Sequence, residues 1–147
     1  MNNKRAFYIS IIFCFLISIK SLYSSSLNEE CLTRTQIEIL IEEILNEKRI
    51  SRYLHADLSS RSPLKIKCNE YIKVSYNITY KSKKILITKN EIYDDLIDIR
   101  FKGIECENSE IVLFFDFISK IEGVGILGKA NKKNNQWHIE ILKEVLI

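Results

Sequence analysis

The chain has few of the residues that interrupt regular structure and few of those that carry out chemistry. It contains one proline and four glycines in 147 residues, so long helices and strands joined by short turns are expected. It contains two histidines, His55 and His138, and neither stands in a metal-ligand or nucleophile motif. We therefore predict no catalytic residues, no metal site and no cofactor, and we expect a protein that is not an enzyme.

Two groups of polar residues have an alternative, chemical interpretation. His55 with Asp57 has the composition of a base and the carboxylate that orients it, but no Ser, Cys or Thr stands in a nucleophile context. Asp94, Asp95 and Asp98 are oxygen ligands of the kind that hard cations prefer, but no glycine-punctuated loop accompanies them. We interpret both groups as solvated polar residues.

Hydrophobic runs are also few, and the one extended run is at the N-terminus. Lys4 and Arg5 precede an apolar run over residues 6–19, and the small residues Ser24–Ser26 follow it. A short basic head, an apolar stretch of about 7–15 residues and a small-residue exit are the layout of a secretory signal peptide. Residues 1–26 are therefore predicted to be a signal peptide that directs the protein to the periplasm or out of the cell.

Removal of this leader leaves residues 27–147, which suit a single domain of about 120 residues. The alternative is that residues 6–19 remain as a membrane anchor. This run has 14 residues, whereas a spanning helix needs about 20. Contact with a membrane is expected only if the anchor is retained.

The predicted mature domain has no excess of either charge. Three of the 22 Lys and Arg residues lie in the leader and all 19 Asp and Glu residues lie outside it, which leaves 19 of each sign. Proteins that bind nucleic acids need a basic excess to neutralise phosphates, so nucleic acid is not an expected partner. The local cluster of Lys81, Lys83 and Lys84 is interpreted as a solvated hairpin tip, with an anionic-lipid patch as the alternative.

Helical periodicity follows the leader. From Thr35 to Tyr53, apolar residues recur at helical spacing on one face, namely Ile37, Leu40, Ile41, Ile44 and Leu45. Thr35 and Glu38 have the spacing of a capping box, which places the start of the helix at Thr35. One wide apolar stripe indicates that this amphipathic helix packs on a flat surface.

The remaining residues are typical of β-strands. Strict alternation predicts a half-buried strand over 71–80, and a turn at 81–84 leads to a strand at 85–89. Further strands are expected over 97–101 (ending at Gly103), 111–118, 123–130 and 137–145, the last two forming a hairpin around 131–136. The predicted fold is α+β, with one N-terminal amphipathic helix packed on a curved antiparallel β-sheet meander.

In the last predicted strand, alternation assigns one face to a set of apolar residues and the opposite face to His138. The apolar set is Trp137, Ile139, Ile141 and Val145.

The segment 113–142 combines aromatic residues on a strand, a glycine turn and a strand that begins with tryptophan. The residues that carry this pattern are Phe115, Phe117, Glu122, Gly123, Gly125, Lys129, Ala130 and Trp137. The pattern resembles the mitochondrial cytochrome c oxidase assembly factor family and its relative, the inner-membrane presequence-translocase accessory subunit. The segment 49–66, with Leu54 and Pro63, is also similar to that family's region between the helix and the first strand.

This resemblance implies a tethered domain that binds other proteins during assembly and has no catalytic residues. The chain departs from the family pattern because no Arg-rich presequence precedes the hydrophobic segment, that segment is short, and the middle of the domain is longer and more charged. The same residues also have a purely structural interpretation. A tryptophan can cover the end of a sheet, and glycines let strands bend.

Export would place the cysteines in an oxidising compartment. Cys31, Cys68 and Cys106 remain after removal of the leader, so a single disulfide can form within the chain. We predict a Cys68–Cys106 bond, since both residues fall at ends of predicted strands, and we expect Cys31 to be free or bonded to a partner molecule. On the chain-entropy model such a bond contributes about 3–4 kcal/mol to stability.

A second feature relevant to export is Asn77-Ile78-Thr79, which is a glycosylation sequon.

Two classes of function are compatible with these observations. The first is an exported or membrane-tethered, non-catalytic protein-binding domain, such as an assembly accessory, an inhibitor or an immunity protein. The second is a small-ligand-binding or enzymatic module with an apolar cavity between helix and sheet, lined by Tyr71, Tyr76, Tyr80 and Tyr93. Balanced charge and missing active-site chemistry favour the first class, with a protein partner outside the cytoplasm.

Overall fold

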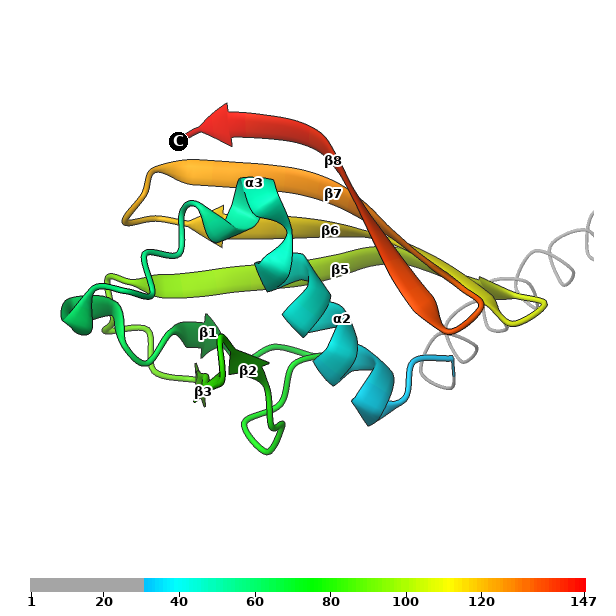
Figure 1. Cartoon of the computed structure of the whole chain (residues 1–147), viewed down its shortest axis with the longest axis horizontal. Helices are drawn as coiled ribbons and strands as arrows, with labels where there is room; N and C mark the ends of the chain where they lie inside the picture. The colour runs from blue at the N-terminus through cyan, green and yellow to red at the C-terminus, as the bar shows by residue number, and fades with distance from the viewer. Residues whose placement is uncertain (1–30) are drawn as a thin grey trace, which may run out of the picture. The chain divides into compact units, whose positions relative to one another are not determined.

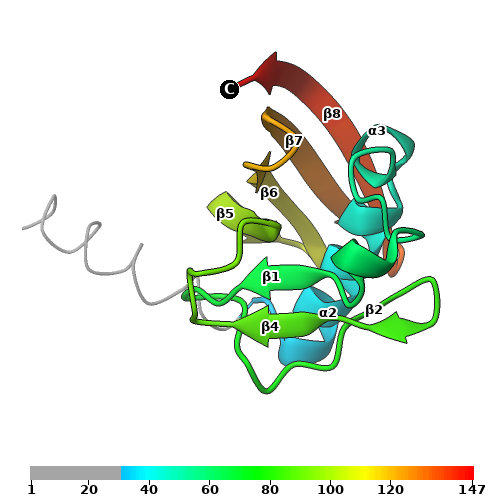
Figure 2. The ribbon, with the colours of Figure 1, turned by 90° about the vertical axis from the view of Figure 1, so that its left-hand side faces the viewer.

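The structure, a computed structural model, describes residues 31–147, and Thr33–Ile147 form one compact unit. The predicted signal peptide or anchor lies outside the described residues. The α+β class is confirmed, with helices on one side of a six-stranded sheet (Figures 1 and 2). The elements are α2 (Arg34–Asn46), α3 (Lys48–Ser51), η1 (Ser59–Arg61), β1 (Lys65–Lys67), β2 (Thr79–Tyr80), β3 (Lys83–Lys84), β4 (Leu86–Thr88), β5 (Leu96–Glu107), β6 (Glu110–Ser119), β7 (Val124–Lys133) and β8 (Gln136–Leu146).

The sheet is mixed, whereas an all-antiparallel sheet was expected. Its strand order is β4-β1-β5-β6-β7-β8. Strands β5 to β8 form the predicted antiparallel meander, but the short β1 pairs in parallel with both β4 and β5. The sequence pattern missed β1 because a strand of three residues is too short to show alternation.

The inner face of the sheet, which α2 crosses, carries the core (Figure 1). One row of this face joins Phe101, Phe115, Gly128 and Ile141 across four strands. Phe115 is fully buried, and a Cβ atom at Gly128 would lie closer than 3.0 Å to three carbons of its ring. The ring therefore packs directly against the backbone of β7, which only glycine permits.

Helix α2 has the predicted apolar stripe, and all five of its predicted core residues are buried. Its start differs from the prediction. Thr33 is the N-cap, its hydroxyl accepts a hydrogen bond from the backbone N–H of Gln36, and the Gln36 side chain accepts one from the N–H of Thr33 at 2.7 Å. The capping box therefore uses Thr33 and Gln36, two residues before the predicted pair.

The predicted continuous helix is interrupted at Glu47. This residue has extended backbone angles (φ −58°, ψ 130°), and its carboxylate accepts hydrogen bonds from the backbone N–H groups of Arg49 and Ile50. Glu47 thus ends α2 and caps α3. Because the apolar period continues through Ile50, periodicity alone does not reveal the break.

The predicted strand over 71–80 is wrong except for its last two residues, which form β2. Helix carboxylates supply the acceptors that a neighbouring strand would offer: Glu38 accepts from the N–H of Asn77, and Glu42 accepts from the N–H and hydroxyl of Thr79, each at 2.8 Å. Ile72 and Ile78 are buried, but Val74 is 54% exposed. This segment is therefore held by hydrogen bonds to side chains of α2 and not by pairing with a neighbouring strand.

The meander hairpins are confirmed, with longer strands than predicted. Their turns are Asn108–Ser109 and Asn134–Asn135, all with positive φ. Strand β5 continues through Gly103, whose φ of +55° lies within an irregularity between Lys102 and Glu105.

Strand β8 contains a bulge that corrects the predicted face of Val145. Leu127 pairs with Lys143 and Gly128 with Ile141, which leaves Leu142 as an extra residue. Beyond this bulge the faces exchange, since a shift of one residue turns every following side chain to the opposite face. Val145 therefore lies on the outer face.

Substitution of Gly128 tests the contact between Phe115 and the β7 backbone. We expect Gly128→Ala to lower the free energy of unfolding by about 1–3 kcal/mol or more, because the added methyl group overlaps the ring. The control is Gly125→Ala on the same strand, whose Cβ would meet a Val145 methyl carbon at 3.3 Å. Urea denaturation should show a much smaller effect for this control, and equal losses would contradict the assignment.

Candidate functional site: the outer face of the sheet

The outer face of strands β5 to β8 is the surface that the described helices leave uncovered. In Figure 2, α2 and α3 lie on the same side of the sheet, opposite this face. Pairing places Ile118, Gly125 and Val145 side by side on β6, β7 and β8. Because Gly125 at the middle position has no side chain, a depression lies between its two apolar neighbours.

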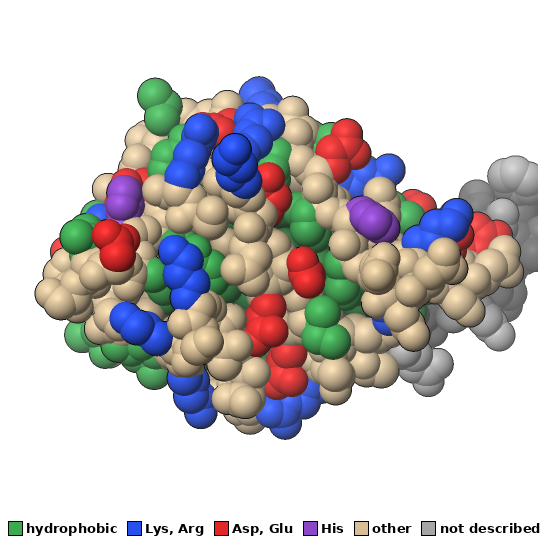
Figure 3. Space-filling view, in the orientation of Figure 1, with side chains coloured by type: hydrophobic (Ala, Val, Ile, Leu, Met, Phe, Trp, Pro, Cys, Tyr) green, Lys and Arg blue, Asp and Glu red, His purple; other side chains and the backbone are tan. Residues whose placement is uncertain are grey.

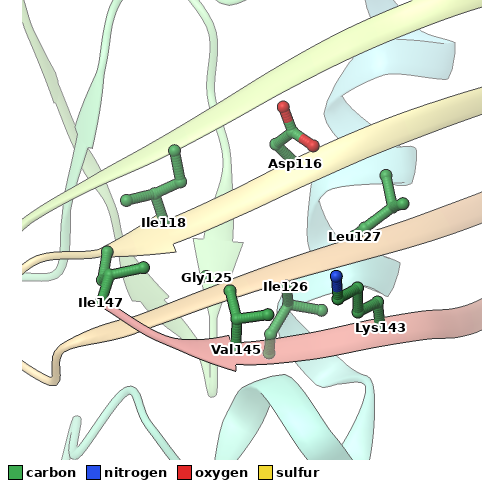
Figure 4. Close-up of a pocket in the computed structure, with 8 residues that line it drawn as sticks. All are labelled: Asp116, Ile118, Gly125, Ile126, Leu127, Lys143, Val145 and Ile147. Carbon is green, nitrogen blue, oxygen red and sulfur yellow. The ribbon is translucent and has the colours of Figure 1, made fainter.

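A groove with a volume of about 230 Å³ runs over this row, and we call it the outer groove. Figure 4 shows Ile118, Val145 and Ile147 around Gly125 at one end, with Asp116, Leu127 and Lys143 at the other. Val145 is 39% exposed and Ile147 is 67% exposed. The outer groove is therefore an open apolar surface with charged residues at one end.

Some charged residues of the outer face have an ion-pair partner among the described residues, and Lys143 has none. Asp116 forms an ion pair with Lys102, and Asp98 pairs with Arg100, where the Nε atom donates at 2.9 Å. The Asp98 carboxylate raises the pKa of Arg100. The side chain of Lys143 forms no ion pair or hydrogen bond with residues 31–147, so it leaves an unmatched positive charge at the rim.

A second, smaller pocket of about 140 Å³ adjoins the outer groove at Ile118, which lines both. Its other lining residues are Lys67, Glu91, Tyr93, Leu96, Asp98, Arg100 and Lys120. Lys67 and Glu91 form an ion pair here, and the bond from Lys67 lowers the pKa of Glu91. The two hollows make the outer face an extended, uneven surface.

A charged cluster on the inner side of β8 has a structural role. Glu144 accepts hydrogen bonds from the Tyr53 hydroxyl and from the guanidinium groups of Arg52 and Arg49. The bond from Tyr53, followed by those from the arginines, lowers the pKa of Glu144. Figure 3 shows basic side chains gathered over α3 with acidic atoms between them. The cluster fastens α3 to the end of β8.

The structure separates the polar groups that had a chemical interpretation. His55 Nε2 lies 3.4 Å from a carboxylate oxygen of Glu122, which also pairs with Arg61 at 2.7 Å, so Asp57 is not the partner of His55. Asp95 pairs with Lys65 at 2.6 Å. Residues 31–147 contain no group of three or more His, Cys, Asp or Glu side chains placed to hold a metal ion.

The four tyrosines considered as cavity lining lie in separate environments. Tyr71 packs against Phe101, with ring centroids 5.7 Å apart, and Tyr80 is buried. Tyr76 lies under the guanidinium of Arg34, and Tyr93 lines the smaller outer pocket. They do not enclose a common cavity.

The predicted Cys68–Cys106 disulfide is wrong. Cys31 and Cys106 are disulfide-bonded, and Cys68 is free. Parallel pairing of β1 places Cys68 near the start of β5, and the side chain of its neighbour Asn69 donates to the carbonyl of Ile99. Cys106 lies seven residues further along β5, about 20 Å away at the rise of a strand, well beyond disulfide reach.

A disulfide in the chain is compatible with an exported protein. Among the helices of residues 31–147, none has the length and hydropathy of a membrane span.

The outer groove was missed because its residues are distributed over three strands and depend on the bulge in β8. Alternation predicted that Val145 shares a face with Trp137, Ile139 and Ile141. Its place beside Gly125 on the outer face was therefore not predicted. The available signal was Ile118 and Leu127, two large apolar residues that alternate with the buried residues of their strands.

Thiol labelling tests the cysteine assignment. Unfolded without reductant, the chain from residue 27 should react with one equivalent of maleimide, at Cys68, and a Cys68→Ala variant should not react. After reduction the unsubstituted chain should take up three equivalents. Labelling at Cys31 or Cys106 before reduction, measured by peptide mass spectrometry, would contradict the assignment.

Acid titration tests the Glu144 cluster. Because the folded-state pKa of Glu144 is lowered, its contribution to stability is present above its unfolded value of about 4.5 and is lost as pH falls through the folded value. Glu144→Gln should therefore reduce the dependence of the unfolding free energy on pH between about pH 5 and pH 2. Glu43→Gln is the control, since Glu43 is exposed and its side chain forms no ion pair within residues 31–147. An equal effect of both substitutions would contradict the role of Glu144.

Comparison of the chain with protein-family models, curated proteins and solved structures found no match. The resemblance to the assembly factor family stays a prediction.

Proposed function

We propose that this protein is an exported, non-catalytic binding domain that holds another protein against the outer face of its sheet. The observation that carries the proposal is the outer groove, an open apolar surface formed by Ile118, Leu127, Val145 and Ile147 over Gly125. Contiguous exposed apolar surface with a polar border is typical of protein interaction sites.

The composition of the outer face fits an interface between proteins. Its centre is apolar, and its border carries Asp98, Arg100, Asp116 and Lys143. Interfaces combine an apolar centre, from which water is excluded, with a charged rim that selects the partner. The unmatched Lys143 favours a partner that presents a carboxylate beside an apolar side chain.

The dimensions of the outer groove favour a protein over a small molecule. Pockets for small ligands usually measure about 300–1,000 Å³ and enclose most of the ligand. The outer groove measures about 230 Å³, and the pocket beside it about 140 Å³. Each has room for an apolar side chain that remains attached to a larger surface.

Residues 1–26 give the proposed location of this activity. Their order of basic head, apolar run and small residues supports export, with retention of residues 6–19 as an anchor as the alternative. In either case the domain would face the far side of a membrane. The mass of the protein recovered from its own envelope fraction would show whether the leader is removed.

Affinity capture with matched variants tests the proposed function. The chain from residue 27 serves as bait in the envelope fraction, alongside Val145→Asp in the outer groove and Val74→Asp as the control. Val74 is 54% exposed and lies outside the meander, so both variants place a charge on the surface. We expect a stoichiometric protein partner on the unsubstituted and Val74→Asp baits, and at least about tenfold less on Val145→Asp.

Two results would contradict this proposal. One is equal capture of the partner by Val145→Asp. The other is a small molecule that co-purifies with the domain in place of a protein.

A further inference from the structure

Strand β8 forms a long open edge of the sheet. It has 11 residues, whereas β4 at the opposite edge has three. An exposed edge strand presents unpaired N–H and C=O groups, and proteins usually keep such strands short, irregular or covered. The first half of β8, residues 136–141, is long and regular, and no strand among the described residues pairs with its outer side.

The turn between β7 and β8 determines which backbone groups face the open edge. Asn134 and Asn135 form a two-residue turn with positive φ at both positions, so Lys133 and Gln136 are the hydrogen-bonded pair that closes the hairpin. Hydrogen-bonded and non-hydrogen-bonded pairs alternate along an antiparallel ladder. The free N–H and C=O groups therefore belong to Trp137, Ile139 and Ile141.

The side chains of these three residues are also only partly covered. They lie on the inner face, in rows with the buried Ile111, Leu113 and Phe115 of β6, yet all three are only half-buried. Each of them thus has an unpaired backbone and a partly exposed apolar side chain on the same stretch of strand. One additional strand would cover both.

We propose that a second copy of this chain supplies that strand, with the two β8 edges paired antiparallel about Ile139. In this register Trp137 faces the partner's Ile141, which is an aromatic and β-branched pair on the inner face. On the outer face His138 lies opposite the partner's Glu140. The two contacts occur twice by symmetry, and the pairing closes at two subunits.

Cross-strand pairs favour this register over its neighbours. Pairing about His138 would place Ile141 opposite the partner's turn residue Asn135, which leaves the open backbone groups of Ile141 unpaired. Pairing about Glu140 would place two carboxylates directly opposite each other, which is destabilising. The bulge at Leu142 ends the regular edge, so the paired segment is limited to residues 136–141.

Amide exchange and sedimentation test this pairing directly. The chain from residue 27 is suitable, because Thr33–Ile147 form a compact unit with its own core. We expect sedimentation equilibrium to show a reversible dimer at micromolar concentrations. In the same range, NMR should show exchange protection of the amides of Trp137, Ile139 and Ile141 that rises with protein concentration, while His138 and Glu140 are protected at every concentration.

Charge variants test the register. His138→Glu places carboxylates opposite each other at two positions of the dimer and should weaken association about 3- to 30-fold. The double variant His138→Glu, Glu140→Lys restores opposite charges and should recover dimerisation. Both sites are exposed, but Glu140→Lys places a lysine opposite Lys129 of β7, so the thermal unfolding of each monomer is measured as the control for folding.

A monomer at all concentrations, protection of the edge amides that does not depend on concentration, or failure of the double variant to recover would each overturn the proposal. Val145→Asp leaves the paired segment intact and should dimerise normally. Loss of the protein partner by that variant therefore reports on the outer groove alone, and the two proposals fail separately.

Discussion

The structure depends on the contact of the Phe115 ring with the bare backbone of Gly128. The two residues lie opposite each other at the centre of the meander, and the ring is fully buried. Any side chain at position 128 would occupy the space of the ring, so the close packing of Phe115 on β7 requires glycine at this position. Leu127, the preceding residue of β7, lies on the outer face by strand alternation.

Local signals in the sequence were sufficient for the elements that stabilise themselves. The apolar stripe of α2 and the polar turn within 131–136 depend on residues close in sequence, and both were predicted. The alternation over 71–78 was misleading because its backbone partners are Glu38 and Glu42, which are about 40 residues away along the chain. Glutamates on a helix look like a solvated face, and nothing in the sequence shows that they accept backbone hydrogen bonds.

The candidate site could not be predicted because it depends on register. An apolar groove on the outer face requires that Ile118, Gly125 and Val145 meet across three strands. Alternation in the sequence indicates the faces of each strand separately, and a single extra residue reverses them. The cysteines show the same limit. Strand ends were identified, but only the parallel pairing of β1 shows that Cys68 and Cys106 lie at opposite ends of β5.

The bulge at Leu142 explains why β8 serves two purposes. Without the extra residue, alternation would turn Glu144 outward and Val145 inward. The Glu144 carboxylate would then leave Tyr53, Arg52 and Arg49, and the outer groove would lose one wall. With the extra residue, residues 136–141 keep an apolar inner face and a regular edge. Beyond the bulge, Glu144 holds α3 on the inner face, and Val145 contributes an apolar side chain to the outer face. One inserted residue thus separates the edge proposed to pair with a second copy from the face proposed to bind a different protein, so the two proposed contacts do not compete for the same surface.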